Sequence, residues 1–382
     1  MKYNMLSPKD FFCKKIICSV LLAICLTGCC SKSDYTLLFL GDIHYDHPEY
    51  HDNEVMKFKA HVPYMQGVMN KDGNFSLRTH TIWVTQAKMI SHKNIALNSA
   101  MWEKYVPQLL LNAAGKANEN NVLYAVQLGD MIHGDCGRLD LHEKNLQDAL
   151  NRLNKYFTVP VLTICGNHDA RGPHGQQAWD NVVVPYLKKQ VADFSPQGTN
   201  YHIRIGRDLY YFHDLMNPDL DYMEKVFKEN SDVRYTFFIT HVLLMPMDRG
   251  CFNDILSDDF HRLFALLESR DAIVLGGHTH RISLTEYHNP ANNHRITQFV
   301  LNSTVRFPEK QLNFVPGTDA RRTVFQPEKF YADLWKMYYD GKLETTLHTN
   351  GAGYALLRVA DKGVFVDYYN LTQNTPHTFQ LR

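Results

Sequence analysis

The chain alternates short apolar runs with amphipathic segments of helical spacing over most of its 382 residues. Short apolar runs bounded by turn residues are typical of buried strands, and their alternation with helical patterns is typical of an α/β protein. We therefore predict an α/β fold. The predicted buried strands are Thr36–Leu40, Leu123–Leu128, Val161–Ile164, Tyr235–Ile239 and Ala272–Leu275.

Two amphipathic segments predict helices, one after a possible cap at Ser99 and one after Asp258 and Asp259. Two pairs of apolar runs predict β-hairpins, one across residues 206–208 and one across residues 361–363. The apolar positions of the helices are Trp102, Val106, Leu109, Leu110 and Ala113 in the first, and Phe260, Leu263, Phe264 and Leu267 in the second.

Two stretches, about 46–98 and 307–350, do not follow the alternation of strand and helix patterns and are rich in aromatic residues, Pro, Asn and Gly. Long irregular connections in a compact domain are usually functional loops or lids. We interpret both stretches as insertions near the active site of one domain that spans residues 29–382. Tyr64 and Trp83 in the first insertion could stack on a base or sugar, but a small core of the insertion itself explains them better.

Residues 1–28 have the features of a targeting segment. Lys14 and Lys15 form a positive flank, and the apolar run 16–26 is too short to cross roughly 30 Å of hydrocarbon as a helix. This pattern predicts a signal peptide. Its end, Leu26-Thr27-Gly28-Cys29, resembles a bacterial lipobox, which implies lipidation of Cys29 and an exported, membrane-anchored protein. Cys30 follows where an aspartate would signal inner-membrane retention, so we expect the outer membrane.

Composition excludes several classes of protein. Lys+Arg and Asp+Glu are both 40, so the chain lacks the basic field of a nucleic-acid binder, and no nucleic-acid polymer is expected as partner. Few cysteines remain beyond the signal segment, which excludes a disulfide scaffold. Cys165 lies in an apolar run and is expected to be buried, whereas a bond between Cys136 and Cys251 is disfavoured. Twenty histidines exceed what packing needs, and histidine is the commonest metal ligand.

Polar residues directly follow each predicted strand, and α/β sheets build their sites at these carboxyl ends. Asp42 and His44 are two positions apart, as are His278 and His280, so side chains of each pair leave on one face if the strand continues. Seven oxygen or imidazole donors result, more than one tetrahedral ion needs and suitable for two ions that share a carboxylate. The candidate ligands are Asp42, His44, Asp130, Asn167, His241, His278 and His280.

Charge supports a phosphate ester as substrate. Two divalent ions with Asp42 and Asp130 leave a net positive centre, which suits the attacking and leaving oxygens of an in-line displacement. Imidazole-rich ligands without thiolates favour Mn, Fe, Co or Zn, and a trivalent ion is compatible with the same donors. Each motif alone is weak, because a Gly-Asp pair is usually a turn and a single strand-end histidine is usually structural.

Together and in order, these motifs resemble the calcineurin-like metallophosphoesterase family over about residues 36–281. The resemblance implies a two-sheet β-sandwich flanked by helices. It implies one metal ion bound by Asp42, His44, Asp130 and His280, and a second bound by Asp130, Asn167, His241 and His278. A hydroxide that bridges the ions would attack phosphorus, and His168 would contact or protonate the leaving oxygen.

Differences from the motifs of known branches of this family narrow the choice among those branches. Protein Ser/Thr phosphatases continue their Gly-Asp motif as Asp-Arg-Gly and carry Asn-His-Glu, whereas His133-Gly134 and Asp169 stand here. Purple acid phosphatases lack a histidine at the position of His44, and lipid A pathway hydrolases replace the histidine that is His168 here. The phosphodiesterase-like branch remains. His133 also stands where an aspartate often orients the catalytic histidine, which leaves that partner open.

The resulting hypothesis is a phosphodiesterase for small or lipid-derived substrates. Two alternatives remain: a phosphomonoesterase that scavenges phosphate from nucleotides or sugar phosphates, and a non-catalytic surface lipoprotein that uses the fold for binding. A guanidinium or imidazole just beyond the motifs could bind a non-reacting phosphate, although each is also explained as a surface residue. These candidate substrate contacts are Arg171, His174, Arg281 and Arg306.

Overall fold

The computed structural model describes residues 34–52, 59–69, 75–85, 92–245, 257–301, 303–304, 335, 339, 342–348, 352–370 and 375–382. The predicted signal peptide with Cys29 lies outside the described residues, and so do Cys251 and Arg306. The unit that contains the site is Asp34–Arg382. No helix in the described part of this unit is long and apolar enough to span a membrane.

One mixed sheet has six strands in the order β15-β14-β13-β1-β4-β5. The strands β1, β4 and β5 are parallel, and β1 pairs with β13 in antiparallel register. Their bounds are β1 Tyr35–Leu40, β4 Ala125–Gln127, β5 Val161–Thr163, β13 Gly353–Ala360, β14 Gly363–Asn370 and β15 His377–Gln380.

The other mixed sheet has seven strands in the order β12-β10-β11-β9-β8-β7-β6. The strands β7, β8, β9 and β11 are parallel. Their bounds are β6 Tyr201–Ile205, β7 Asp208–Phe212, β8 Thr236–Ile239, β9 Ile273–Gly276, β10 Ile282–His288, β11 Arg295–Val300 and β12 Lys342–His348. A separate antiparallel pair is formed by β2 (Lys59–Met69) and β3 (Phe75–Thr85).

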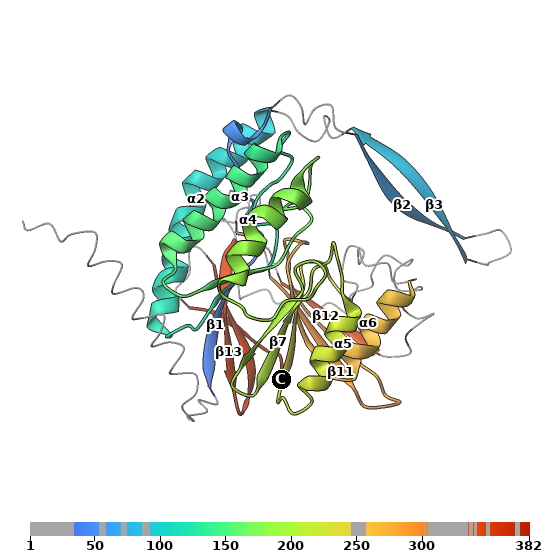
Figure 1. Ribbon diagram of the computed structural model, residues 1–382. Coiled ribbons are helices and arrows are strands. Elements are labelled where there is room, and N and C mark those ends of the chain that lie inside the picture. Colours follow the sequence, from blue (N-terminus) through green and yellow to red (C-terminus); the bar gives the residue numbers. More distant parts are fainter. Residues whose placement is uncertain are drawn as a thin grey trace, which may run out of the picture. The chain divides into compact units, whose positions relative to one another are not determined.

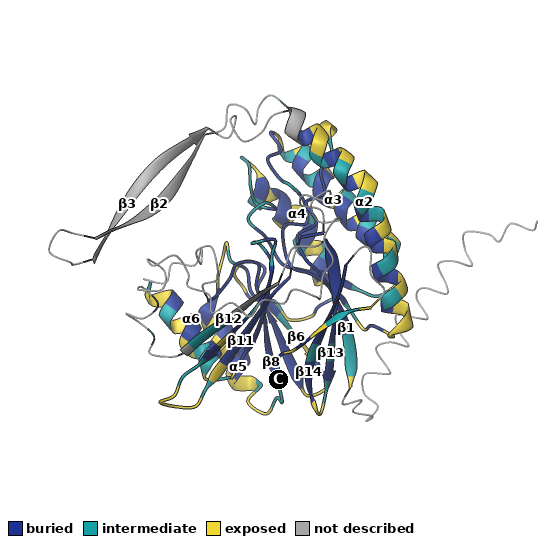
Figure 2. Cartoon of the chain, turned by 180° about the vertical axis from the view of Figure 1, so that it is seen from behind, coloured by how far each residue is buried: buried dark blue, intermediate teal, exposed yellow. Residues whose placement is uncertain are grey.

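The two large sheets pack face to face around one apolar core. Phe39 and Leu357 of the six-stranded sheet meet Leu275 and Phe299 of the seven-stranded sheet around one small space. Burial is concentrated on these strands and on the inner sides of the helices (Figure 2). Burying such side chains stabilises the fold by about 1.5–3 kcal/mol each.

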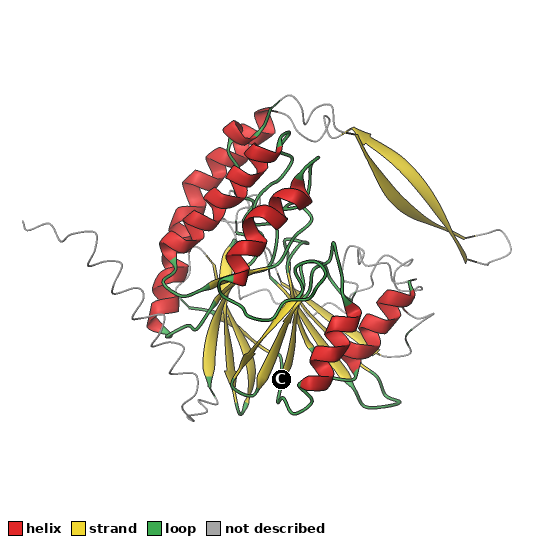
Figure 3. Cartoon of the chain, in the orientation of Figure 1, coloured by secondary structure: helices red, strands yellow, loops and turns green. Residues whose placement is uncertain are grey.

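Helices cover the outer faces of the sandwich (Figures 1 and 3). Helices α2 (His92–Glu119), α3 (Leu139–Tyr156) and α4 (Gly175–Lys188) lie on the side of the six-stranded sheet, and α2 contacts β1 and β13. Helices α5 (Leu220–Glu229) and α6 (Asp258–Glu268) lie against the seven-stranded sheet, where α6 contacts β11. The predicted α/β class and two-sheet arrangement are confirmed.

Several local predictions need correction. Helix α2 begins at His92, so Ser99 lies inside the helix and is not its cap. Ile95, Ser99 and Trp102 lie on one buried stripe of this helix. The cap of α6 is Ser257, whose hydroxyl accepts from the N–H of Phe260. The stretch 307–350 contains β12, which pairs with β10 and so belongs to the main sheet. Helices α3, α4 and α5 were also not predicted as helices.

Both predicted hairpins are present, as β6–β7 and β13–β14. The burial predicted for Cys165 is confirmed, and Cys136 is a free, buried thiol. Burial raises the pKa of both thiols, which keeps them protonated and unreactive. The motif-bearing strands β1, β4, β5, β8 and β9 run parallel within their sheets and bring their carboxyl ends to one edge of the sandwich.

Candidate metal centre

The residues after the strands turn sharply instead of extending them. His44, His278 and His280 have φ angles of 49°, 69° and 55°, and Asp130 has 54°. The prediction that a continuing strand aligns the Asp-x-His and His-x-His pairs is therefore wrong, since β1 ends at residue 40 and β9 at residue 276. Positive φ in residues with a side chain costs about 1–3 kcal/mol and clusters at functional sites. Four such residues converge here.

One group of side chains comprises Asp42, His44, Asp130 and His280, whose ligand atoms lie within 4.8 Å of one another. Nε2 of His280 lies 2.6 Å from Oδ2 of Asp42 and 3.0 Å from Nε2 of His44. Oδ2 of Asp130 lies 3.7 Å from Nε2 of His44. All four residues are buried. Oxygen and imidazole donors that converge in this way suit a transition-metal ion.

A second group comprises Asp130, His241 and His278, with ligand atoms again within 4.8 Å. Nε2 of His241 lies 3.2 Å from Oδ2 of Asp130 and 3.3 Å from Nδ1 of His278. Asn167 joins this group, because its Oδ1 lies 3.2 Å from the same nitrogen of His241. All seven predicted ligands are thus brought together, and Asp130 belongs to both groups.

Backbone N–H groups fix the orientation of the two carboxylates. Oδ1 of Asp130 accepts from the N–H of His168 at 2.7 Å, and Oδ1 of Asp42 accepts from the N–H of His278 at 3.0 Å. In each case Oδ2 is left to face the histidines. Nδ1 of His241 donates to the carbonyl oxygen of Leu128 at 2.8 Å, which directs the lone pair of Nε2 toward Asp130.

Two glycines make this close packing possible. A Cβ at Gly277 would lie 2.4 Å from Oδ1 of Asp42. A Cβ at Gly166 would lie 2.2 Å from the backbone nitrogen of Asp130. Real Cβ atoms do not approach polar atoms so closely, so the glycines beside the ligands allow one loop to reach another. The Gly-Gly-His and Gly-Asn-His motifs therefore have a steric explanation.

Electrostatics at the centre fits bound cations. Burial alone would lower the pKa of His241, yet Asp130 raises it to about 10, so the site favours positive charge there. Burial lowers the pKa of His44 well below its usual value and that of His278 to about 4, which keeps both in the neutral form that binds metals. Oδ2 of Asp42 is buried and is left without a donor when Nε2 of His280, 2.6 Å away, carries no proton. A metal ion would satisfy it.

His168 belongs to neither of these two groups, although its ligand atom lies with those of His44 and His133 in a third group within 4.8 Å. Its ring centroid is 4.5 Å from that of His44. Its Nδ1 lies 2.8 Å from the carbonyl oxygen of His133, so the partner that the sequence left open is a backbone oxygen. Burial lowers the pKa of His168 to about 4. The side chain of His133 also lies nearby, with its ring centroid 4.9 Å from that of His168.

The predicted substrate contacts have different surroundings. Arg171 lies 2.9 Å from Nε2 of His168, measured from one guanidinium nitrogen, and is ion-paired with buried Asp135. His174 is exposed at the N-terminus of α4, and Arg281 is half-buried directly after His280. Arg306 lies outside the described residues. Arg171 is the described candidate whose contact with His168 the structure shows.

Asp169, which follows His168, was not predicted to have a role. Its carboxylate accepts from the N–H groups of Ile132 at 3.0 Å and Gly166 at 2.9 Å. Burial, followed by the charge of Asp130, raises its pKa to about 7. Asp169 thus ties the loop after β4 to the loop after β5. The feature of the sequence that could have indicated this role is the position of Asp169 in the Gly-Asn-His-Asp motif.

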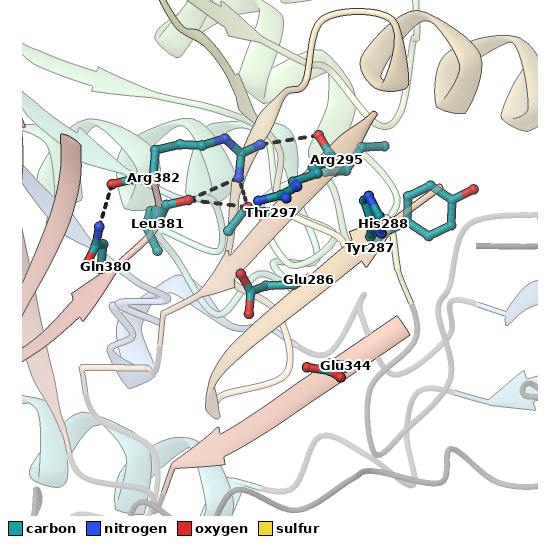
Figure 4. A pocket seen from close by; sticks show the side chains of 10 residues that line it. Glu286, Tyr287, His288, Arg295, Thr297, Glu344, Gln380, Leu381 and Arg382 are labelled. Atoms are coloured by element: carbon teal, nitrogen blue, oxygen red, sulfur yellow. Dashed lines mark hydrogen bonds between the residues drawn. The ribbon is translucent and has the colours of Figure 1, made fainter. Parts of the chain in front are cut away.

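A separate cavity of about 560 Å³ lies on β10, β11, β12 and the last residues of the chain (Figure 4). Arg382 crosses it and donates to the carbonyl oxygens of Asp271 at 2.8 Å and Arg295 at 3.2 Å. None of the predicted ligands lines this cavity. Its charged groups, Glu286 and Glu344 with Arg295 and Arg382, contain no cluster of metal ligands.

Comparison with known proteins gives one family match. The model of the family described as calcineurin-like phosphoesterase matches residues 35–282. No curated protein matches the chain.

Several solved structures resemble it at low identity. A dimetal phosphatase from Danio rerio is 10% identical with a TM-score of 0.49, covering 91% of this chain and 99% of its own. TT1561 from Thermus thermophilus is 14% identical with a TM-score of 0.31, covering 51% of this chain and 84% of its own. A Vps29 single mutant from Entamoeba histolytica is 11% identical with a TM-score of 0.29, covering 70% and 86%.

Proposed function

The chain belongs to the calcineurin-like phosphoesterase family, and from this premise we propose that it hydrolyses phosphodiesters of small or lipid-derived substrates with two metal ions. The observation that carries the proposal is the position of Asp130, whose Oδ2 faces His44 of one ligand group and His241 of the other. A carboxylate shared in this way suits two ions a few ångströms apart. Such ions supply Lewis acidity, which activates water and neutralises charge on phosphoryl oxygens.

The residues of the chain perform the remaining tasks. Asp42, His44, Asp130 and His280 would hold one ion, and Asp130, Asn167, His241 and His278 the other. The backbone N–H groups that fix Asp42 and Asp130 preorganise the donors, so that little rearrangement accompanies binding. Mn, Fe, Zn and Co all suit these donors.

We assign assistance of the leaving group to His168, either by direct contact or through a neighbouring donor that it holds. It lies against His44 but is oriented by the carbonyl oxygen of His133, so it is placed next to the ions without belonging to either ligand group. Assistance to the leaving oxygen matters most for alkoxides, because charge builds on that oxygen in the transition state.

The preference for a diester rests on motifs rather than on the geometry of the centre. The chain lacks the Asp-Arg-Gly and Asn-His-Glu sequences of protein phosphatases, and it has both His44 and His168. These features favour the phosphodiesterase-like branch of the family.

The test is turnover by the metal-stripped protein refilled with Mn, Zn, Fe or Mg. Bis(4-nitrophenyl) phosphate serves as the diester and 4-nitrophenyl phosphate as the monoester. We expect a higher kcat/KM on the diester and no turnover by Asp42→Asn, with Asp140→Asn, an exposed carboxylate on α3, as the matched control. A preference for the monoester would support a scavenging phosphatase, and no turnover with any metal would contradict catalysis.

We also propose that the protein is exported and anchored through a lipid on Cys29, at the outer membrane. The support is the lipobox-like sequence behind a short apolar run. An anchor of this kind would place the site near phosphate esters derived from lipids.

A further inference from the structure

Arg171 is held next to His168 by several contacts. One guanidinium nitrogen lies 2.9 Å from Nε2 of His168, and the other is ion-paired with Asp135 and donates to the carbonyl oxygen of His133 at 3.1 Å. The carboxylate of Asp135 is buried, and the side chain of Arg171 is 20% exposed. The planar fork of an arginine suits such a set of simultaneous contacts, which a lysine cannot reproduce.

The two loops that carry this contact are joined closely. The N–H of Asp135 donates to the carbonyl oxygen of Arg171 at 2.9 Å. A Cβ at Gly134 would lie 2.1 Å from the carbonyl oxygen of His168, so only glycine permits this approach. The position of the guanidinium is therefore determined by the backbone as well as by its ion pair.

The hydrogen bonds define which nitrogen of His168 carries a proton. The carbonyl oxygen of His133 can only accept, so Nδ1 of His168 donates to it. The guanidinium of Arg171 can only donate, so Nε2 of His168 accepts from it. His168 is then a neutral imidazole with no proton on Nε2. The N–H groups at this contact belong to Arg171.

We propose that Arg171 is a further residue of the reaction machinery, which supplies positive charge and an N–H donor to the leaving oxygen, and that His168 positions it. The inference rests on the proposed function and specifies how the leaving group is assisted. The nitrogen that contacts His168 carries a second N–H, which the proposal assigns to the leaving oxygen. A preorganised donor of this kind is worth about 10²–10³-fold in rate.

The test compares Arg171→Met and Arg171→Lys in the full-length, metal-loaded protein. The substrates are bis(4-nitrophenyl) phosphate and glycerophosphoethanolamine, an alkyl diester. We expect Arg171→Met to lose about 10²-fold in kcat on the alkyl ester and less than about tenfold on the nitrophenyl ester, with unchanged metal content and little change in KM. Arg171→Lys should recover only part of the loss. Arg138→Met, which removes an exposed arginine paired with Asp140, is the control.

Two further measurements separate this role from a structural ion pair. Guanidinium ion added to Arg171→Ala should restore part of the rate on the alkyl ester, which a purely structural role would not predict. In the ¹⁵N spectrum of the histidine rings, the signal lost in His168→Ala should show a protonated Nδ1 and an unprotonated Nε2. A proton on Nε2 would overturn the proposal, because Arg171 could not donate to it.

If Arg171→Met does not fold because Asp135 is left unpaired, Arg171→Met combined with Asp135→Asn removes both charges and should show the same ratio of losses. Equal losses on the two esters, or losses no greater than in Arg138→Met, would overturn the role of Arg171 while leaving the phosphoesterase function intact. Absence of turnover in the unmodified protein would instead contradict the proposed function itself.

Discussion

Nε2 of His44 and Nε2 of His280 lie 3.0 Å apart, although 236 positions separate them in the chain. The two residues follow β1 and β9, which belong to different sheets. Two neutral imidazole nitrogens at this distance repel through their lone pairs unless a proton or a metal ion lies against them. Asp42 and Asp130 face the same point, so a cation is the natural occupant.

Asp130→Asn should be the most damaging single change to metal binding. Its Oδ2 faces both ligand groups, and the substitution removes a charge that both ions would share. We expect loss of both ions, whereas His241→Ala should mainly empty one site. The measurement is elemental analysis after dialysis, with Asp140→Asn as the control. Two ions per chain in Asp130→Asn would show that this carboxylate is not shared.

Gly277→Ala should weaken metal binding without touching a ligand. The added Cβ would lie 2.4 Å from Oδ1 of Asp42, which must then shift or turn away from its backbone donor. The same substitution at Gly115 meets nothing within 4 Å on the exposed side of α2, so it should stabilise the protein by about 0.5–1 kcal/mol. The metal content of the two variants tests the first expectation, and their unfolding by denaturant tests the second. Full metal content in Gly277→Ala would contradict the steric argument.

Much of the centre could be predicted from sequence because each ligand follows an apolar run. Asp42, Asp130 and His241 lie within three residues of the ends of buried strands, and the carboxyl ends of parallel strands meet at one edge. The turns that aim the side chains could not be predicted. His278 and His280 adopt positive φ because other loops hold them there, and local propensity disfavours that conformation.

Contacts between polar loops could not be predicted from the sequence either. The partner of Arg171 is Asp135, which lies in a loop after a different strand and carries no pattern that marks it as a partner. Strand β12 was missed for another reason. Strand β12 mixes apolar and polar residues without a continuous hydrophobic run, so its pairing with β10 is apparent only in the fold.

Arg234→Met should destabilise the fold far more than loss of an exposed ion pair. Arg234 binds buried Asp208 with two nitrogens, at 3.0 Å and 2.6 Å, and Tyr35 donates to the same carboxylate at 2.8 Å. Removing the cation leaves a buried charge uncompensated, which costs about 3–5 kcal/mol.

The control for this change is Arg204→Met, because Arg204 pairs with exposed Asp232 and such pairs contribute about 0.2–1 kcal/mol. Urea unfolding of both variants gives the difference in the free energy of unfolding. Equal effects of the two substitutions would mean that the Asp208 pair adds no more than a surface pair.

Cys29→Ala should release the protein from membranes. Lipidation at Cys29 is predicted from the preceding Leu26-Thr27-Gly28 sequence, and stable anchoring depends on the attached acyl chains. The measurement is partitioning into a detergent phase, with Cys30→Ala as the control that leaves the predicted site intact. Unchanged partitioning of Cys29→Ala would remove the lipoprotein assignment.

His168→Ala should separate substrates by their leaving groups. A nitrophenolate leaves with little help, whereas an alkoxide develops charge that must be neutralised by a proton or by a nearby cation. Loss of His168 removes the acceptor that orients one guanidinium nitrogen of Arg171, and with it the assistance to the leaving oxygen. We therefore expect the variant to retain its metal ions and its KM, and to lose about 10²–10⁴-fold on an alkyl ester but much less on a nitrophenyl ester. His294→Ala, which removes a partly exposed histidine paired with Asp271, is the control. When His168→Ala is combined with Arg171→Met, it should add little further loss of rate, because the effects of residues that act as one unit are not additive. A metal-depleted variant would instead identify His168 as a ligand.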